Sequence, residues 1–367
     1  MSRLDAFLQI GKQQGGSDIH FAVGLPPLVR LDGELLPIPY RELSQDESEA
    51  LVVEVLNEHQ VEQLRTHGSL DFAYHAEGIG RFRVNACRQR RGYSAFFRVV
   101  PDRVPSLEDL GLPRVLSSFC RLGSGLVLVT GATGTGKSTT LAAMIHEINR
   151  SRSMNIVTLE DPIEFMHASE RSLVIQREVG THVPTFQDGL RDALRQDPDV
   201  ILVGELRDAE SVTLALEAAE TGHLVLGTLH TRGAAQTIDR IVDAFPTESQ
   251  AQVRHTLADN LKCVLSQELV RAADGRGRRA AVEILVVNGA VSQLIRDGTT
   301  FQIPGSIMTG RRLGMQQMDQ ALLAMVRAGD IDPDEAFVKA QDRREFIPYL
   351  TDKSLLTLVG PPEGKAA

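Results

Sequence analysis

The chain has 367 residues, of which 42% are hydrophobic, so it is long for one domain and comfortable for two. Its 39 Lys and Arg against 48 Asp and Glu give a net charge of −9, which excludes a general electrostatic attraction for nucleic acid or anionic lipid. Three widely spaced cysteines without a CxxC pair favour neither a disulfide framework nor a four-thiolate zinc site. The absence of a leader pattern or a long apolar run predicts a cytoplasmic, soluble protein.

The first hundred residues predict a small α+β domain. Helical periodicity at residues 46–64 is followed by three β-rich segments, at residues 70–74, 80–86 and 95–99. Pro101 and Pro105 then indicate a linker. We therefore assign residues 1–100 to an N-terminal domain and residues 101–122 to a linker.

The middle of the chain predicts an α/β core over residues 123–287, because apolar strand patterns alternate there with helical stretches. The clearest strands are expected at residues 126–129, 155–159, 200–203 and 224–228. The remainder is mostly helical, with helices expected at residues 315–328 and 333–341. We assign residues 288–350 to a helical C-terminal region and residues 351–367 to a polar tail, whose last residues are expected to be disordered.

A glycine-rich segment lies between the first of these strands and a helical pattern, in the order required of a phosphate-binding loop. Its glycines let backbone N–H groups curl round the phosphates, and the helix N-terminus faces the anion. Lys137 would supply charge to the β- and γ-phosphate oxygens, and Ser138 a hydroxyl to Mg²⁺. The sequence therefore predicts an ATPase. The expected nucleotide-binding residues of the loop are Gly131, Ala132, Thr133, Gly134, Thr135, Gly136, Lys137, Ser138 and Thr139.

Acidic residues follow two further predicted strands, where the ligand crevice of an open α/β sheet lies. Glu160, Asp161 and Glu164 come after one strand, and Glu205 comes after the other. Hydrolysis needs a metal and a way to orient the attacking water. Glu205 is the strongest candidate, either on Mg²⁺ or in orienting the nucleophile, and the general base stays open among Glu160, Glu164 and Glu205. A solvated acidic turn is the alternative for the first group.

His223 and His230 bracket the strand expected at residues 224–228, at a spacing that does not favour a metal site. We expect them to hydrogen-bond phosphate or to sense its loss across a subunit boundary, with an ordinary structural role as the alternative. Arg83 and Arg98 lie on predicted strands of the first domain. Such arginines are usually solvated, but one that reaches a neighbouring subunit's γ-phosphate contributes about 10³ to 10⁵ in rate.

Together these motifs resemble the secretion and pilus ATPase superfamily, most closely the type IV pilus retraction ATPases, the PilT and PilU group of twitching-motility motors. The resemblance covers nearly the whole chain, with further matches at residues 15–20, 80–85, 176–180, 193–199 and 313–316. It implies a RecA-like P-loop ATPase core with a smaller N-terminal α+β PAS-like domain and a helical C-terminal region. It also implies that Glu164 activates water, that Glu205 belongs to the second acidic motif, and that Arg83 and Arg98 act in trans.

The resemblance further implies a homohexameric ring that uses ATP and Mg²⁺, acts on an inner-membrane pilus platform protein and drives pilus retraction. The ring would be cytoplasmic and peripheral at the inner membrane through the pilus machine, with no nucleic acid as a partner. The chain lacks the longer N-terminal region and tetracysteine insert of the extension and secretion ATPases, which favours retraction over assembly.

Residues 290–297 differ at four positions from the AIRNLIRE motif of the best-known retraction motors. The sequence therefore leaves open whether the chain retracts pili alone or as an accessory to a second retraction ATPase. Two other classes also stay open: a ring member that binds nucleotide with little turnover, and a nucleic-acid motor. The acidic balance and the absence of Trp weigh against the second of these.

Overall fold

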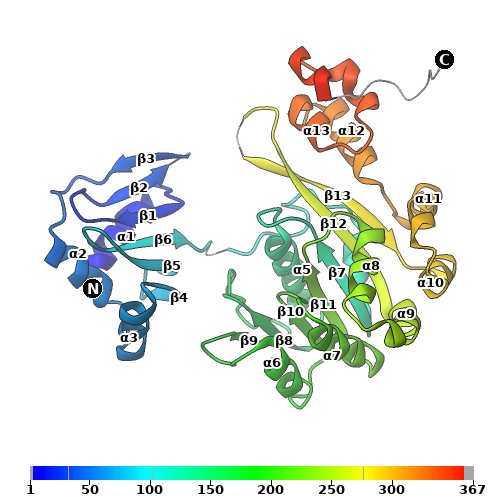
Figure 1. Ribbon diagram of the computed structural model, residues 1–367, viewed down its shortest axis with the longest axis horizontal. Helices are drawn as coiled ribbons and strands as arrows, with labels where there is room; N and C mark the ends of the chain where they lie inside the picture. Colours follow the sequence, from blue (N-terminus) through cyan, green and yellow to red (C-terminus); the bar gives the residue numbers. More distant parts are fainter. Residues whose placement is uncertain (1–2, 32, 102, 276, 359–367) are drawn as a thin grey trace. The chain divides into compact units, whose positions relative to one another are not determined.

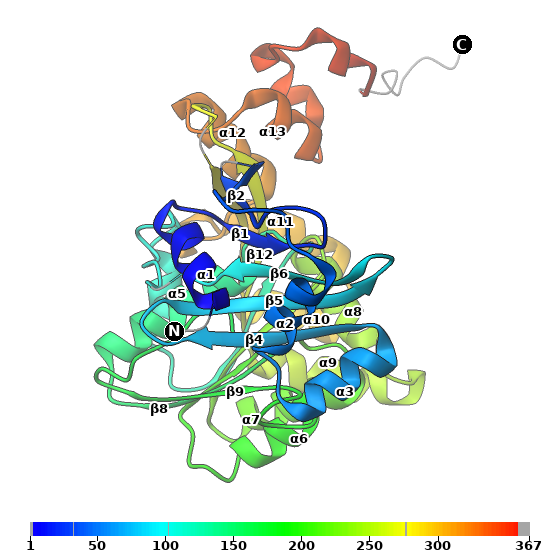
Figure 2. The same cartoon turned by 90° about the vertical axis from the view of Figure 1, so that its left-hand side faces the viewer.

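The computed structural model describes residues 3–31, 33–101, 103–275 and 277–358, which fall into two units shown from two directions in Figures 1 and 2. The smaller unit comprises the described parts of Met1–Arg103 and Pro162–Met166, and the larger unit those of Val104–Asp161 and His167–Ala367.

An antiparallel sheet in the order β3-β2-β1-β6-β5-β4 forms the smaller unit, together with helices α1, α2 and α3. Alternate residues of its strands face a buried core, in which Phe97 contacts the rings of Phe21, Tyr74 and Phe82. The elements are α1 (Arg3–Gln13), β1 (Asp18–Phe21), β2 (Leu28–Leu31), β3 (Glu34–Pro37), α2 (Gln45–Val53), α3 (Glu58–His67), β4 (Ser69–Ala76), β5 (Gly80–Gln89) and β6 (Gly92–Val99).

The single helix expected at residues 46–64 is two helices. α2 ends at Val53, and Asn57 then begins α3 by accepting a hydrogen bond from the Gln60 backbone N–H while the Gln60 side chain accepts one in return. This reciprocal pair satisfies amides that a new helix start leaves free, so the chain restarts there. The three expected strands are confirmed as β4, β5 and β6.

Seven strands among the described residues form the sheet of the larger unit, in the order β13-β12-β7-β11-β10-β8-β9. All pair in parallel except β13, which returns antiparallel along β12 and adds one antiparallel edge to the predicted parallel sheet. β7, β10 and β11 are buried along their whole length, which explains their continuous apolar sequences. The bounds are β7 (Gly125–Thr130), β8 (Asn155–Glu160), β9 (Leu173–Glu178), β10 (Val200–Val203), β11 (Leu224–Leu229), β12 (Leu261–Arg271) and β13 (Arg278–Val286).

Helices cover both faces of this sheet (Figure 1). Val127 and Val129 of β7 pack with α4 and α5, whereas Leu126 and Leu128 pack in a second cluster with α6 to α11. This alternation gives the predicted α/β core its three layers. The bounds are α4 (Val115–Phe119), α5 (Lys137–Ser151), α6 (Phe186–Ala193), α7 (Ala209–Glu220), α8 (Ala234–Asp243), α9 (Thr247–Asn260), α10 (Gly289–Arg296) and α11 (Ile303–Thr309).

The C-terminal helices pack on the far ends of β12 and β13, where Val270 and Ala281 join their buried cluster. They are α12 (Met318–Ala328) and α13 (Pro333–Lys339), with short 3₁₀ helices at Thr300–Gln302, Arg311–Leu313, Arg343–Tyr349 and Lys353–Leu358. α12 begins three residues later than expected, because Gln316 exchanges backbone hydrogen bonds with Ile284 of β13. The last 3₁₀ helix lies in the stretch expected to be a tail, and residues 359–367 lie outside the described residues.

Phe97→Ala is expected to lower the free energy of unfolding of the smaller unit by about 3–5 kcal/mol, because it leaves a cavity among the aromatic rings. Phe96 lies next to Phe97 but is 37% exposed, against 0% for Phe97. Phe96→Ala is therefore the matched control, with an expected cost of about 1 kcal/mol or less. Guanidinium unfolding followed by circular dichroism measures both, and equal costs would contradict the core described above.

Candidate functional site

The loop between β7 and α5 has a backbone shape that only glycine adopts easily. Gly131, Gly134 and Gly136 have φ values of +143°, +80° and +86°. A Cβ on Gly131 would lie 2.4 Å from the Gln267 carbonyl oxygen, and one on Gly136 would lie 2.9 Å from Gln267 Nε2. Within the loop, the Thr135 hydroxyl donates to the Ala132 carbonyl over 2.9 Å. The glycine spacing therefore serves both the curl of the loop and its close approach to β12.

Lys137 begins α5, and its buried side chain turns back over the loop. Its ammonium donates to the carbonyl oxygens of Gly131, at 2.9 Å, and Ala132, at 3.0 Å. The same group lies 3.4 Å from Nδ1 of His230, which follows β11. Ser138, the next residue of α5, is exposed. A cation and an accessible hydroxyl thus meet at the N-terminus of a long helix, where an anion is favoured.

Glu205 follows β10 and is held from two sides. Its Oε1 lies 3.1 Å from Nε2 of His230, and its Oε2 lies 2.8 Å from Nε of Arg207. Since the Lys137 ammonium can only donate, Nδ1 of His230 accepts from it, and the ring proton sits on Nε2 and is donated to Glu205. A neutral His230 therefore connects Lys137 to Glu205 in one chain of hydrogen bonds.

Glu160 ends β8 beside this arrangement. The Leu159 carbonyl accepts from the backbone N–H of Gly204, the residue before Glu205, over 2.7 Å. Glu160 Oε1 accepts from the hydroxyl of Thr158 at 2.7 Å and from Gln176 Nε2 at 3.1 Å. The next residue, Asp161, is exposed. The larger unit thus brings together the loop, Glu160, Asp161, Glu205 and His230 at one edge of its sheet.

Glu164, Arg83 and Arg98 belong instead to the smaller unit. Arg83 and Arg98 are direct cross-strand neighbours on β5 and β6, and each faces a carboxylate. Arg83 Nη1 lies 3.7 Å from Glu164 Oε1, and Arg98 Nε lies 2.9 Å from Asp18 Oδ1. Partial burial acts to raise the pKa of Asp18, but hydrogen bonds from Ser17 and Arg98 outweigh it and lower that pKa. The carboxylates offset the repulsion of two adjacent guanidinium groups.

His223 lies at the opposite edge of the sheet from the loop. Its strand, β11, pairs in parallel with β7, so that Leu224 faces Gly125 and Leu229 faces Thr130. Six strand residues, about 20 Å, therefore separate His223 from the loop end of the sheet. Its Nδ1 lies 2.9 Å from the Ala218 carbonyl oxygen, which fastens it to the end of α7. Within one chain, the structure does not bring His223 together with the loop.

Sequence reasoning missed Gln267, a buried residue of β12 that holds the loop in place. Its Nε2 donates to the Thr135 carbonyl over 2.7 Å, and its Oε1 accepts from the Thr140 hydroxyl, also over 2.7 Å. Both ends of the amide are thereby satisfied against the loop and α5. The available signal was the polar pair Ser266 and Gln267 directly after the apolar run at residues 263–265.

The donor chemistry of the site fits Mg²⁺. Mg²⁺ takes oxygen ligands and is usually held by one or two protein groups together with substrate phosphates and water. Ser138 offers a hydroxyl and Glu205 a carboxylate beside the loop. No cluster of three or more His, Cys, Asp or Glu residues suited to a metal ion occurs in the described part of the chain.

None of the helices in the described ranges combines the length and apolar character needed to cross a bilayer.

The chain is similar to known proteins of secretion systems and type IV pili. The family model "Type II/IV secretion system protein" matches residues 13–337. A Pseudomonas aeruginosa protein described as "Type IV pilus retractation ATPase PilT" is 46% identical over 339 residues, covering 92% of this chain and 98% of that protein. Another from the same organism, "Type IV pilus ATPase PilU", is 38% identical over 342 residues, covering 93% and 90%.

A solved structure supports the same relationship. The chain is similar to the "Crystal Structure of the Pilus Retraction Motor PilT and Bound ADP", with a TM-score of 0.87 and 42% identity, over 94% of this chain and 98% of that one. The similarity extends over both units, and the α/β core with a smaller N-terminal unit and C-terminal helices, as predicted, is confirmed.

Gln267→Leu is expected to weaken binding of an ATP analogue about tenfold or more, because it leaves the Thr135 carbonyl and the Thr140 hydroxyl without their partner. Ser266→Ala is the matched control: its hydroxyl pairs with Thr130 at 2.8 Å and does not contact the loop. Titration with a fluorescent ATP analogue compares the two. Equal affinities for Gln267→Leu and the unaltered chain would show that the amide does not position the loop.

Proposed function

The chain belongs to the family of type II/IV secretion system proteins, and on that premise we propose that it is an ATP-hydrolysing motor of type IV pilus retraction and twitching motility. The chain of contacts from Lys137 through His230 to Glu205 supports this proposal most directly. These contacts connect the Lys137 ammonium, which would bind the β- and γ-phosphates, to the Glu205 carboxylate, which would act at the site of γ-phosphate cleavage.

We assign the loop residues Gly131 to Thr139 to the phosphates. An incoming triphosphate offers Lys137 a stronger partner than the Gly131 and Ala132 carbonyl oxygens, so the ammonium would turn to it. Ser138, with Glu205 acting directly or through water, would hold Mg²⁺, which supplies positive charge to the phosphate oxygens.

We assign Glu205 to orienting the attacking water as well, since His230 and Arg207 fix both of its oxygens. Glu164 is the proposed residue that activates the water, as the family resemblance implies, with Glu160 and Glu205 as the other candidates. Glu160 and Asp161 would border the nucleotide. A role for His223 is proposed only across a subunit boundary.

Arg83 and Arg98 are proposed to act in trans within a homohexameric ring. Each is about half-exposed or more, with 43% and 68% of the side chain accessible, so the ion pairs with Glu164 and Asp18 leave room for exchange with a phosphate. The ring would engage an inner-membrane pilus platform protein from the cytoplasmic side, with no nucleic acid as a partner. For each subunit of the ring we keep the proposed division of the chain. It consists of an N-terminal domain (1–100), a linker (101–122), the ATPase core (123–287), a helical region (288–350) and a tail (351–367).

The second candidate function is that of an accessory motor that assists another retraction ATPase. The 38% identity to a PilU protein and the altered motif at residues 290–297 favour this alternative. Three of the altered residues, Ser292, Gln293 and Asp297, make hydrogen bonds inside the chain. The Ser292 hydroxyl donates to the Ala258 carbonyl over 2.9 Å, and Gln293 Nε2 donates to Asp297 Oδ1 over 2.8 Å. The substitutions are thus accommodated within α10 and against its neighbour α9, which favours the proposal of a motor that acts alone.

Lys137→Ala is expected to abolish productive ATP binding, and Glu205→Gln to allow binding while reducing turnover at least about 100-fold. The matched control is Glu210→Gln, an exposed carboxylate five residues beyond Glu205. Phosphate release by the purified protein measures turnover. In cells carrying Glu205→Gln, surface pili should accumulate without twitching. Normal turnover would contradict the assignments, and cells without pili would indicate assembly instead.

Arg83→Ala and Arg98→Ala are expected to be nearly inactive alone and partly rescued when mixed with Lys137→Ala subunits. In a one-to-one mixture about a quarter of the interfaces would combine an intact Lys137 with an intact arginine from the neighbour. Arg88→Ala, an exposed arginine on the same strand as Arg83, is the control and should be fully active alone. Absence of rescue at every mixing ratio would count against action in trans.

A further inference from the structure

Glu283 of β13 is a largely buried carboxylate that holds the starts of two helices. Its Oε1 accepts from the backbone N–H of Ala234, the first residue of α8, over 2.8 Å. The backbone N–H of Met318, the first residue of α12, faces the same carboxylate. Burial raises the pKa of Glu283, while the two backbone N–H groups act in the opposite direction. One side chain thereby joins α8, α12 and β13.

α8 is a direct continuation of the segment that meets the nucleotide loop. Three residues separate His230, which contacts Lys137 and Glu205, from Ala234. This short segment is braced: the hydroxyl groups of Thr231 and Thr237 lie 2.7 Å apart, and Thr237 also donates to the Gly233 carbonyl over 2.8 Å. A displacement of His230 is therefore passed to the start of α8 and is not absorbed between them.

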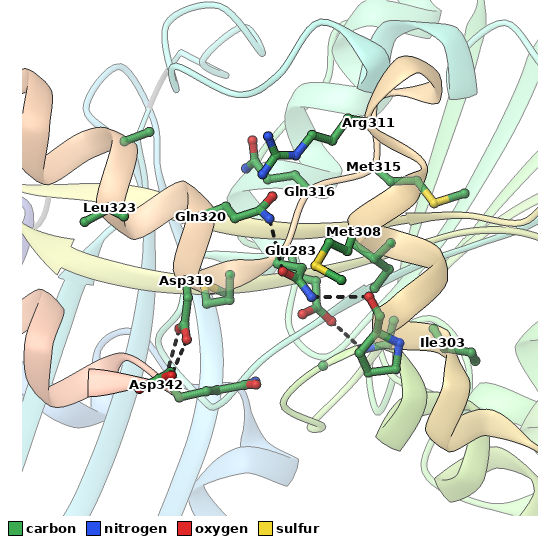
Figure 3. A pocket seen from close by; sticks show the side chains of 18 of the residues that line it. Glu283, Ile303, Met308, Arg311, Met315, Gln316, Asp319, Gln320, Leu323 and Asp342 are labelled. Carbon is green, nitrogen blue, oxygen red and sulfur yellow. Dashed lines mark hydrogen bonds between the residues drawn. The ribbon is translucent and has the colours of Figure 1, made fainter. Parts of the chain in front are cut away.

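α12, on the other side of Glu283, begins the C-terminal group of helices. A cavity of 1270 Å³ lies between these helices and the rest of the larger unit, and Glu283 is part of its wall. Figure 3 shows the Glu283 carboxylate with Asp319 and Asp342 on one side and Ile303 and Met308 on the other. Apolar packing with Ala281 attaches α12 to β13, and its start is held in addition by its approach to Glu283 and by the backbone bridge between Ile284 and Gln316.

We propose that Glu283 is a positioning residue that transmits the arrival of nucleotide at the loop to the C-terminal helices. The inference rests on the proposed function, because it needs a triphosphate to draw the Lys137 ammonium away from His230. His230 then loses its donor on Nδ1, and its segment and the start of α8 adjust together. The shared carboxylate moves with the Ala234 N–H and shifts the Met318 N–H, so α12 responds to a ligand that it does not touch.

The charge of Glu283 is essential to this role. A carboxylate that faces the first N–H groups of two helices interacts favourably with both helix dipoles, and an amide of the same shape does not. Glu283→Gln should therefore keep the packing and loosen the attachment of α12. The expected effect is about fivefold faster hydrogen exchange at the Met318 amide without nucleotide.

The test is hydrogen exchange of the full chain with and without a non-hydrolysable ATP analogue and Mg²⁺. In the unaltered chain, the analogue should change exchange of the α12 amides at residues 318–322 by about threefold or more. In Glu283→Gln, the analogue should bind with an affinity within about twofold of the unaltered chain, and the α12 response should disappear.

Asp319→Asn is the matched control. Asp319 lies in the same turn of α12, but its carboxylate accepts from the backbone N–H groups of Gln341 and Asp342 and makes no contact with α8. This variant should alter basal exchange and keep the response to the analogue. Thr237→Val leaves Glu283 intact and loosens the segment after His230, so it should lose the response.

The proposal is overturned if the analogue binds the unaltered chain without a response at α12, or if Glu283→Gln or Thr237→Val keeps the full response. Failure of the unaltered chain to bind the analogue would instead refute the proposed function, and the coupling with it. Titration of the same samples distinguishes the two results.

Discussion

Parallel strand pairing is the constraint on which the rest of the site depends. β7, β11, β10 and β8 run in the same direction, so whatever follows each strand arrives at one edge of the sheet. The glycine loop, His230, Glu205 and Glu160 follow these strands in that order across the sheet. Lys137 and His230, 93 positions apart in the chain, can therefore share a hydrogen bond. The same rule sends His223, which precedes its strand, to the other edge.

The site is organised by donors and acceptors with no freedom to exchange roles. Lys137 can only donate and Glu205 can only accept, so the histidine between them has its tautomer fixed. A phosphate that recruits Lys137 removes one end of this chain of contacts. The segment after His230 is short and braced by threonine hydroxyl groups. A movement of the Lys137 ammonium is therefore passed to the start of α8 and, through Glu283, to α12.

In the smaller unit, each of two neighbouring arginines is paired with a carboxylate. A chain of net charge −9 places two arginines side by side on one sheet face and offsets them with Asp18 and Glu164. Exposed ion pairs of this kind contribute little to stability. They keep guanidinium groups ordered and available, which suits a residue proposed to reach a phosphate on a neighbouring subunit.

The sequence by itself determined the α/β core, the strands β4, β5 and β6 of the N-terminal unit and the glycine loop, because hydrophobic period and glycine spacing are local properties of the chain. It did not reveal the break between α2 and α3, where a capping pair overrides helical periodicity. Gln267 and Glu283 became recognisable only in the tertiary structure. Their partners lie more than thirty residues away, and which backbone groups a buried amide or carboxylate must satisfy is decided by how strands and helices pack.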